Sequence, residues 1–256
     1  MNEGYWKRQY DLNEGKYDRN LEAVSAILID NRGYIFEDPV DETVIVMCSG
    51  GMDSITLVDV AVQKWNCKVI MLYFRRDAKN QKWEEKAVDF FYEFYKERHP
   101  ENILELVKLD IQIPSRVNKE HLDRTRQKIM GLPLRNATMW CNAFAQAVYL
   151  SGKYDTTIRT ILVGSVMEDG NNPESGILSI LTQTLLACVG MGLWYYQIRA
   201  PFIEGEGWDK LDLIEHARER DIPIEKSRSC FSPDEEPCHE CTACVNRDRA
   251  FADANL

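Results

Sequence analysis

Short apolar runs alternate with longer stretches of helical periodicity along most of the chain. Four runs have the length and the β-branched residues of buried strands: residues 43–48, 68–74, 102–111 and 160–165. Between them, apolar positions recur at helical spacing, which predicts helices over 53–64 and 82–98 and a loop leading into a long helix within 131–152. The order strand, helix, strand, helix, strand predicts an α/β fold, with a parallel sheet covered by helices on both faces.

Residues 176–198 carry no charge and are long enough to cross a membrane as a helix. Polar residues and glycines within them disfavour that interpretation: Ser179, Thr182, Gln183, Thr184, Gly190 and Gly192. We expect instead a buried helix that ends near Cys188 and is followed by a short strand.

Residues 1–40 form a polar, aromatic-rich lead-in with one apolar stretch at 23–29 and a turn at 30–33. The first residues lack the apolar segment of a signal peptide, so we expect a cytoplasmic protein. We expect three parts: an N-terminal extension over 1–40, a main domain over 41–225 and a cysteine-rich segment over 226–256.

The 256-residue chain is 45% hydrophobic and has a formal net charge of −10. This hydrophobic content is ordinary for a folded protein. The acidic charge argues against nucleic-acid binding as the main task, because phosphate backbones need a clustered cationic face. The expected partners are therefore a small molecule or a protein rather than nucleic acid or a membrane, and we expect a homo-oligomer.

The segment SGGMDS directly follows the first expected strand and precedes a helical run. Gly50 and Gly51 let backbone N–H groups approach an anion, and the hydroxyls of Ser49 and Ser54 add donors. Phosphate loops commonly include a lysine, but this one holds Asp53, which suits an anion that arrives with Mg²⁺. The alternative is structural: Asp53 or Ser49 only caps the following helix.

Four of the eight cysteines gather near the C-terminus: Cys230, Cys238, Cys241 and Cys244. Their spacing, C-x7-C-x2-C-x2-C, lets the thiolates point at one centre and is typical of tetrahedral Zn²⁺ in a structural site. An iron–sulfur cluster is the main alternative, and free buried thiols are the third. The other cysteines lie among apolar neighbours and are expected to be small core residues: Cys48, Cys67, Cys141 and Cys188.

The loop SGGMDS resembles the SGGxDS signature of the PP-loop ATP pyrophosphatases, which cleave ATP between its α- and β-phosphates. The cysteine segment, followed by Arg247 and Ala250-Phe251, resembles the C-terminal zinc motif of the 7-cyano-7-deazaguanine synthases within that class. Five upstream segments match the same family in order: residues 132–136, 162–170, 171–175, 200–202 and 209–230. The resemblance extends over residues 43–251.

This resemblance implies a reaction. ATP activates the carboxylate of 7-carboxy-7-deazaguanine as an acyl adenylate, ammonia forms the amide, and a second activation dehydrates it to the nitrile, releasing AMP and pyrophosphate. It also implies that the catalytic residues are Ser49, Asp53 and Ser54. ATP and Mg²⁺ are expected to bind Ser49, Gly50, Gly51, Asp53, Ser54, Phe74 and Gly164.

The same resemblance assigns the deazaguanine pocket to Arg135, Asn136, Asp169 and Glu174. An Arg suits the substrate carboxylate, and a carboxylate suits the guanine-like N–H edge. The simpler alternative is a surface loop with a helix cap at the first two residues and ordinary polar loops at the others.

Two features depart from the family pattern. Residues 1–40 precede the family's usual start, and its F-D-Y-G-Q-R-H segment is here FRRDAKNQKW, which keeps Phe74 and Gln81 but has no histidine. A close alternative is therefore that the enzyme transfers the activated acid to an amine of a protein or of another acceptor. Residues 1–40 would then hold that acceptor. Further alternatives are a tRNA-modifying or sulfur-transfer PP-loop enzyme, the latter needing a reactive thiol outside the zinc set, and a nucleotide-binding partner without activity.

Overall fold

The computed structural model describes residues 17–114, 118–121, 131–167, 173–204 and 207–255. Its strands are β1 (Thr43–Met47), β2 (Lys68–Arg75), β3 (Ile103–Asp110), β4 (Thr160–Leu162) and β5 (Gln197–Arg199). They form one sheet in the order β3-β2-β1-β4-β5, and all neighbouring pairs are parallel. The helices are α2 (Tyr17–Arg32), α3 (Met52–Trp65), α4 (Gln81–Arg98), α7 (Arg135–Tyr154), α8 (Ile177–Met191), α9 (Lys210–Glu219) and α10 (Thr242–Asp253). Short 3-10 turns are η1 (Lys119–His121) and η3 (Ile224–Lys226).

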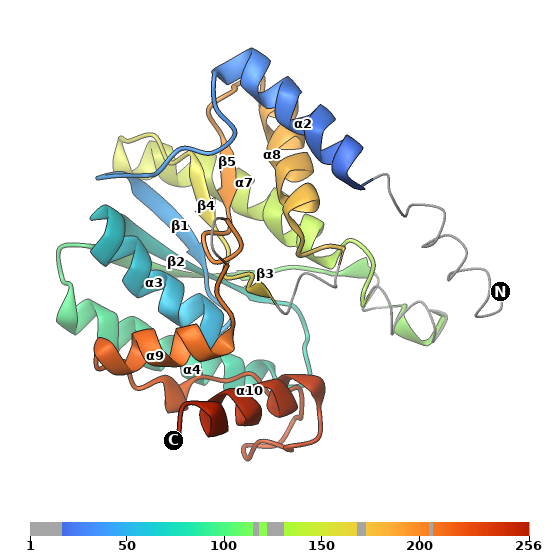
Figure 1. The fold of residues 1–256 in the computed structure, drawn as a ribbon. Helices are drawn as coiled ribbons and strands as arrows, with labels where there is room; N and C mark the ends of the chain where they lie inside the picture. Colours follow the sequence, from blue (N-terminus) through green and yellow to red (C-terminus); the bar gives the residue numbers. More distant parts are fainter. Residues whose placement is uncertain (1–16, 115–117, 122–130, 168–172, 205–206, 256) are drawn as a thin grey trace.

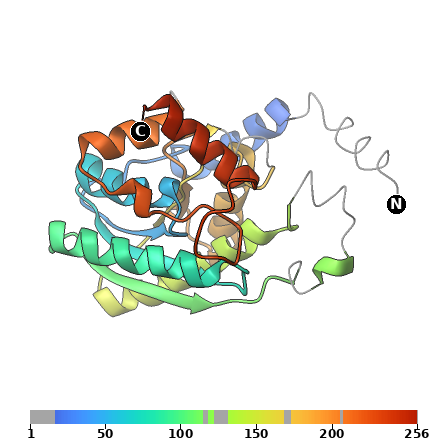
Figure 2. The same ribbon diagram turned by 90° about the horizontal axis from the view of Figure 1, so that it is seen from below.

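Helices cover both faces of the sheet, as the sequence predicted (Figure 1). The side chains of β1 alternate between two cores because successive residues of a strand face opposite sides. Val44 and Val46 join the core beneath α3, α4, α9 and α10, whereas Ile45 joins the core beneath α7 and α8. Figure 2 shows the first of these faces from below, with α4 in teal, α9 in orange and α10 in red. The α/β fold with a parallel sheet is confirmed.

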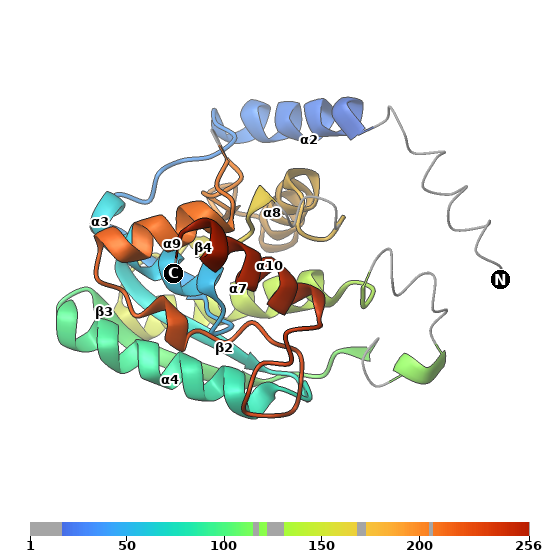
Figure 3. The same ribbon diagram turned by 60° about the horizontal axis from the view of Figure 1, so that its bottom comes forward.

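The N-terminal lead-in contains a helix, α2, that was not expected from the sequence. It packs on α8, outside the layers that touch the sheet (Figures 1 and 3). Arg32 anchors its end by donating from Nη1 to the carbonyl of Tyr196 (2.9 Å). The turn predicted at 30–33 is wrong for its first three residues, which are helical; the chain turns at Gly33, whose φ is +82°.

Two further boundaries differ from the expectation. β4 ends at Leu162 rather than at residue 165, because the chain leaves the sheet there to pass close to α3. α8 continues to Met191 instead of ending near Cys188, and Gly192 closes it with a φ of +67°. β5 follows, as predicted. Within the described residues, no helix is long and apolar enough to cross a membrane.

The C-terminal part adds two helices, α9 and α10, that were not predicted from the sequence. A capping box starts α9: Asp209 accepts the backbone N–H groups of Leu211 and Asp212, and the Asp212 carboxylate accepts the N–H of Asp209. Both helices pack into the core that contains β1 and α3, since Leu213 and Ala250 are buried there. The division at residues 40 and 225 stays a prediction.

Candidate active site

The SGGMDS loop joins the carboxyl end of β1 to α3. The N–H of Cys48 still donates to the carbonyl of Leu72 (2.8 Å), and the chain then leaves the sheet. The Ser54 hydroxyl holds the loop closed: it accepts the N–H of Ser49 (3.1 Å) and donates to the carbonyl of Gly51 (3.1 Å). The two predicted serines are therefore brought together, with their Oγ atoms 3.4 Å apart.

No side chain of the described residues caps the first turn of α3, whose N-cap position is Gly51. The capping role considered for Ser49 or Asp53 is thus not seen. The first backbone N–H groups of a helix lack partners within the helix and carry partial positive charge. The start of α3 therefore has the arrangement that binds phosphate in other loop-to-helix sites.

Close packing requires glycine at two positions near the loop. Gly50 has a φ of +79°, and a Cβ there would lie 2.8 Å from the carbonyl oxygen of Glu84. At Gly164, a Cβ would lie 2.8 Å from the carbonyl carbon of Asp53 and 2.9 Å from the nitrogen of Ser54. The segment after β4 therefore runs directly against the first turn of α3.

Replacing Gly164 with alanine is expected to lower ATP turnover by about 10- to 100-fold, because the start of α3 must shift and misplace the loop. Steady-state AMP formation measures the effect. The matched control is Gly152→Ala, since a Cβ at Gly152 meets no atom within 4 Å. Normal AMP formation by Gly164→Ala would show that the loop does not depend on this close approach.

A lysine does reach the loop, from a distant part of the chain. Lys210, the first residue of α9, places its Nζ 2.8 Å from Oδ1 of Asp53, 157 residues away in sequence. The Lys210 side chain is 12% exposed and that of Asp53 is 26% exposed. The capping box at Asp209 was a local signal that a helix begins here, but nothing local showed that this helix packs on α3.

The cysteine segment also touches the loop. The N–H of Arg228 donates to the carbonyl of Gly50 (2.6 Å). Two residues later, the carbonyl of Cys230 accepts a hydrogen bond from Nδ2 of Asn80 (2.8 Å). Trp83 donates from Nε1 to the carbonyl of Pro233 (2.7 Å). The segment therefore bridges the phosphate loop and the start of α4.

The four predicted metal-binding cysteines converge. The Sγ atoms of Cys230, Cys238, Cys241 and Cys244 all lie within 4.8 Å of one another. Four thiolates at the usual Zn–S distance of about 2.3 Å in a tetrahedron are about 3.8 Å apart, so the donor set fits one zinc ion. Backbone N–H groups of Ser232 and Cys238 point at the sulfur of Cys230 (3.3 Å each).

The electrostatics favour a thiolate at Cys238. Hydrogen bonds from the backbone N–H groups of Glu240 and Cys241 lower the pKa of Cys238 to about 6. Such N–H donors stabilise the deprotonated form, which is the form that binds metal.

The remaining cysteines divide into two kinds. Cys48, Cys67 and Cys188 are buried, as expected. Burial raises the pKa of Cys48 well above its usual range and that of Cys67 to about 12, which makes both poor nucleophiles. The expectation that Cys141 is a core residue is wrong: it lies on the exposed face of α7.

Three of the four predicted substrate residues lie together at the start of α7. The N–H of Asn136 donates to Oε2 of Glu174 (3.3 Å), and Nε of Arg135 donates to Oδ1 of Asn136 (3.1 Å). Burial raises the pKa of Glu174, although the N–H of Asn136 and the charge of Arg135 oppose that shift. Asp169 lies outside the described residues.

The segment that departs from the family pattern is tied to α4. Gln81 accepts the N–H groups of Arg76 (2.8 Å) and Asp77 (2.9 Å) through Oε1, and Arg76 forms a largely buried ion pair with Glu84 (2.8 Å). Phe74 is 3% exposed and packs in the core beneath α7 and α8. Its ring contributes to that core, and contact with ATP stays a prediction.

A family model and the curated relatives agree on the family. The model of the family described as "Queuosine biosynthesis protein QueC" matches residues 43–255. The 7-cyano-7-deazaguanine synthases of Methanosarcina barkeri and Prochlorococcus marinus are 23% and 25% identical, and each match covers 83% of this chain and 94% of the relative. Among solved structures, NMN synthetase from Francisella tularensis is similar with a TM-score of 0.44 and 14% identity over 94% of this chain and 96% of that one. A 4-thiouridine synthetase in complex with RNA and ATP has a TM-score of 0.46 and 14% identity over 83% and 51%. Because the family model spans most of its length, this chain belongs to the QueC family and is an ATP-dependent enzyme.

Proposed function

We propose that this enzyme makes 7-cyano-7-deazaguanine from 7-carboxy-7-deazaguanine, ammonia and ATP. The substrate carboxylate attacks the α-phosphorus and pyrophosphate leaves; ammonia then attacks the acyl carbon and displaces AMP, which gives the amide. The amide oxygen then attacks the α-phosphorus of a second ATP, and pyrophosphate leaves. Loss of AMP, which carries that oxygen away, and of both protons from the nitrogen gives the nitrile. The observation that carries this proposal is an SGGMDS loop completed by Lys210, in a chain whose curated relatives are named 7-cyano-7-deazaguanine synthases.

The ATP side of the reaction uses the loop and α9. The backbone N–H groups of the loop and of the start of α3 hold the phosphates, and Ser49 and Ser54 keep the loop in shape. Asp53 is a carboxylate of the kind that binds Mg²⁺, and the ion neutralises phosphate charge when bound. Lys210 faces the same carboxylate and stabilises the charge of the leaving pyrophosphate.

The substrate side uses the cluster at the start of α7. Arg135 binds the carboxylate of 7-carboxy-7-deazaguanine, and Glu174 accepts hydrogen bonds from the guanine-like edge. Support comes from the topology: α7 follows β3 and the Glu174 segment follows β4, so both lie at the carboxyl edge of the sheet, where the phosphate loop also lies. Asn136 links the start of α7 to the Glu174 segment, since its N–H donates to Glu174 and its side chain donates to Ser175. Asp169 completes the proposed substrate pocket, and Gly164 belongs to the ATP side.

The cysteine site is proposed to hold structural zinc. Sulfur atoms within 4.8 Å of one another suit a single ion better than an iron–sulfur cluster, whose thiolates bind separate iron atoms. All four donors come from the protein, so the site is closed and does not take part in the chemistry.

Transfer of the activated acid to another amine is the second candidate. The observation in its favour is the segment of residues 74–83, where the family's histidine is absent and Arg76 and Gln81 are engaged within the chain. The acceptor would then be an amine of a protein or of another molecule. A homo-oligomer stays a prediction under either candidate.

Mass spectrometry of a complete reaction distinguishes the two. Purified protein is incubated with Mg-ATP and 7-carboxy-7-deazaguanine, with and without ammonium. The proposed function requires the nitrile to appear only with ammonium, together with AMP. An adenylate or amide that never proceeds to nitrile would support transfer to another acceptor, and absence of AMP would contradict both.

A further inference from the structure

Helices α3 and α9 run side by side and parallel, and two polar pairs join them (Figure 3). Lys210 meets Asp53 at 2.8 Å, and Nε2 of His216 lies 3.0 Å from Oδ2 of Asp59. Both pairs have the same sequence separation, 157 residues. Since a helix rises about 1.5 Å per residue, the pairs lie about 9 Å apart along both helices, which fixes a common register.

Asp59 is an unusual residue for its position. Its side chain is 0% exposed in the middle of α3, next to the fully buried Val58. Oδ2 contacts His216 and lies 3.4 Å from Nε of Arg220, at the end of α9. Within the described part of the chain, Oδ1 has no hydrogen-bond partner. A buried carboxylate is costly and an apolar residue here would cost less, so stability alone does not account for Asp59.

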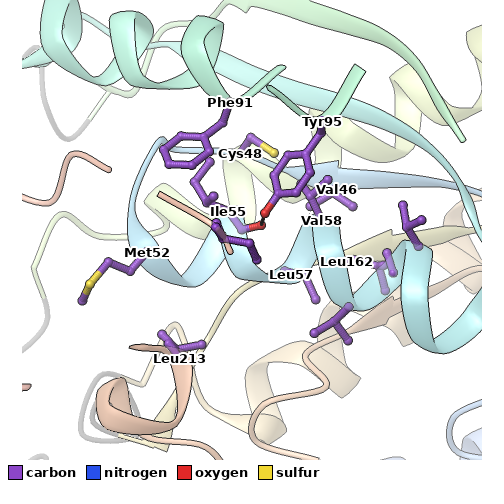
Figure 4. Packing of buried hydrophobic residues seen from close by; sticks show 14 of the residues in the cluster. Val46, Cys48, Met52, Ile55, Leu57, Val58, Phe91, Tyr95, Leu162 and Leu213 are labelled. Atoms are coloured by element: carbon purple, nitrogen blue, oxygen red, sulfur yellow. Dashed lines mark hydrogen bonds between the residues drawn. The ribbon is translucent and has the colours of Figure 1, made fainter. Parts of the chain in front are cut away.

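The apolar contacts between the two helices are less specific to one register than the polar pairs are. Leu213 of α9 belongs to the same buried core as Ile55 and Leu57 of α3, and Figure 4 shows part of this core. Hydrophobic contact is non-directional, so it specifies a register less sharply than a hydrogen bond does. A slide of one helical turn, about 5.4 Å, would remove Lys210 from Asp53. Hydrogen bonds are directional, and the one between Asp59 and His216, together with the ion pair between Asp59 and Arg220, forms at one register only.

We propose that Asp59 is a positioning residue for the ATP site. Through His216 and Arg220 it fixes the register of α9 on α3 and so holds Nζ of Lys210 at the carboxylate of Asp53. This inference rests on the proposed function for the role of Lys210 in binding the phosphates, but it concerns residues that do not touch ATP.

A double-mutant cycle tests it with the full-length protein. Calorimetry measures the affinity for α,β-methylene-ATP, an analogue that resists cleavage, in the presence of Mg²⁺. The proteins compared are wild type, Asp59→Asn, Lys210→Met and the double variant. Each single substitution is expected to weaken binding about tenfold, and the double variant is expected to bind no more weakly than Lys210→Met alone. If the two losses multiply, or if Asp59→Asn binds as wild type does, the positioning role is overturned.

A control variant separates positioning from loss of stability. Leu150→Ala lowers stability from the opposite core, where Leu150 is 1% exposed, and is expected to leave analogue affinity unchanged. If Asp59→Asn fails to fold, His216→Gln takes its place in the same cycle with the same expected outcome. Nitrile formation by the wild type is assayed separately. If the nitrile forms but Asp59 and Lys210 are not coupled in analogue binding, only the positioning role is overturned. If the two residues are coupled but no nitrile forms, only the proposed reaction is contradicted.

Discussion

Replacing Lys210 with methionine is expected to lower the rate of AMP formation by about 100- to 1,000-fold. Lys210 is nearly buried at the phosphate loop, where a positive charge is worth much more than in water because the surroundings are less polar. Methionine keeps the length and the apolar stem but removes the charge that stabilises pyrophosphate as it leaves. Steady-state AMP formation at saturating ATP measures the effect.

The matched control for that substitution is Lys226→Met, at an exposed lysine of η3. It is expected to form AMP at the wild-type rate. A Lys210→Met enzyme that also keeps the wild-type rate would show that Lys210 is only the ion-pair partner of Asp53. The phosphate loop would then act through its backbone and metal ion alone.

Replacing Cys238 with serine is expected to remove the metal and to lower the melting temperature by about 10 °C or more. Cys238 lies centrally in the site, with its sulfur 3.5 Å from that of Cys230 and 3.9 Å from that of Cys244. A structural zinc site contributes folding free energy directly. A loss of about 4 kcal/mol corresponds to a shift of roughly 8–16 °C for a domain of about this size.

ATP-analogue affinity is expected to fall in the same variant, because the cysteine segment holds the carbonyl of Gly50 through the N–H of Arg228. Elemental analysis measures zinc and iron in each protein, and calorimetry measures binding. Cys141→Ser, at the exposed cysteine of α7, is the control and is expected to keep the wild-type metal content and melting temperature. Undiminished metal in Cys238→Ser, or iron in the wild type, would contradict a four-cysteine zinc site.

Local features of the chain were predictable from the sequence. The strands β1, β2 and β3 are apolar runs of strand length, and the SGGMDS loop carries its own signature, so both appeared where the pattern placed them. The cysteine spacing likewise predicted a cluster because x2 intervals keep thiols close.

Features that depend on tertiary packing were not predictable in the same way. Lys210 is 157 residues from Asp53, and only the docking of α9 on α3 brings them together. Cys141 looked buried because its neighbours are apolar, but α7 turns that position outward while Trp140 and Ala143 face the core. The length of β4 was overestimated because the chain around Gly164 has left the sheet and packs closely against the first turn of α3.

The most direct measurement follows oxygen from substrate to AMP. With ¹⁸O in both carboxylate oxygens of 7-carboxy-7-deazaguanine, attack of the carboxylate on the α-phosphorus transfers substrate oxygen to the phosphate of AMP. Two activations for each nitrile predict two AMP molecules, each carrying one ¹⁸O. AMP without ¹⁸O would mean that water attacks ATP, and it would contradict activation of the carboxylate at this site.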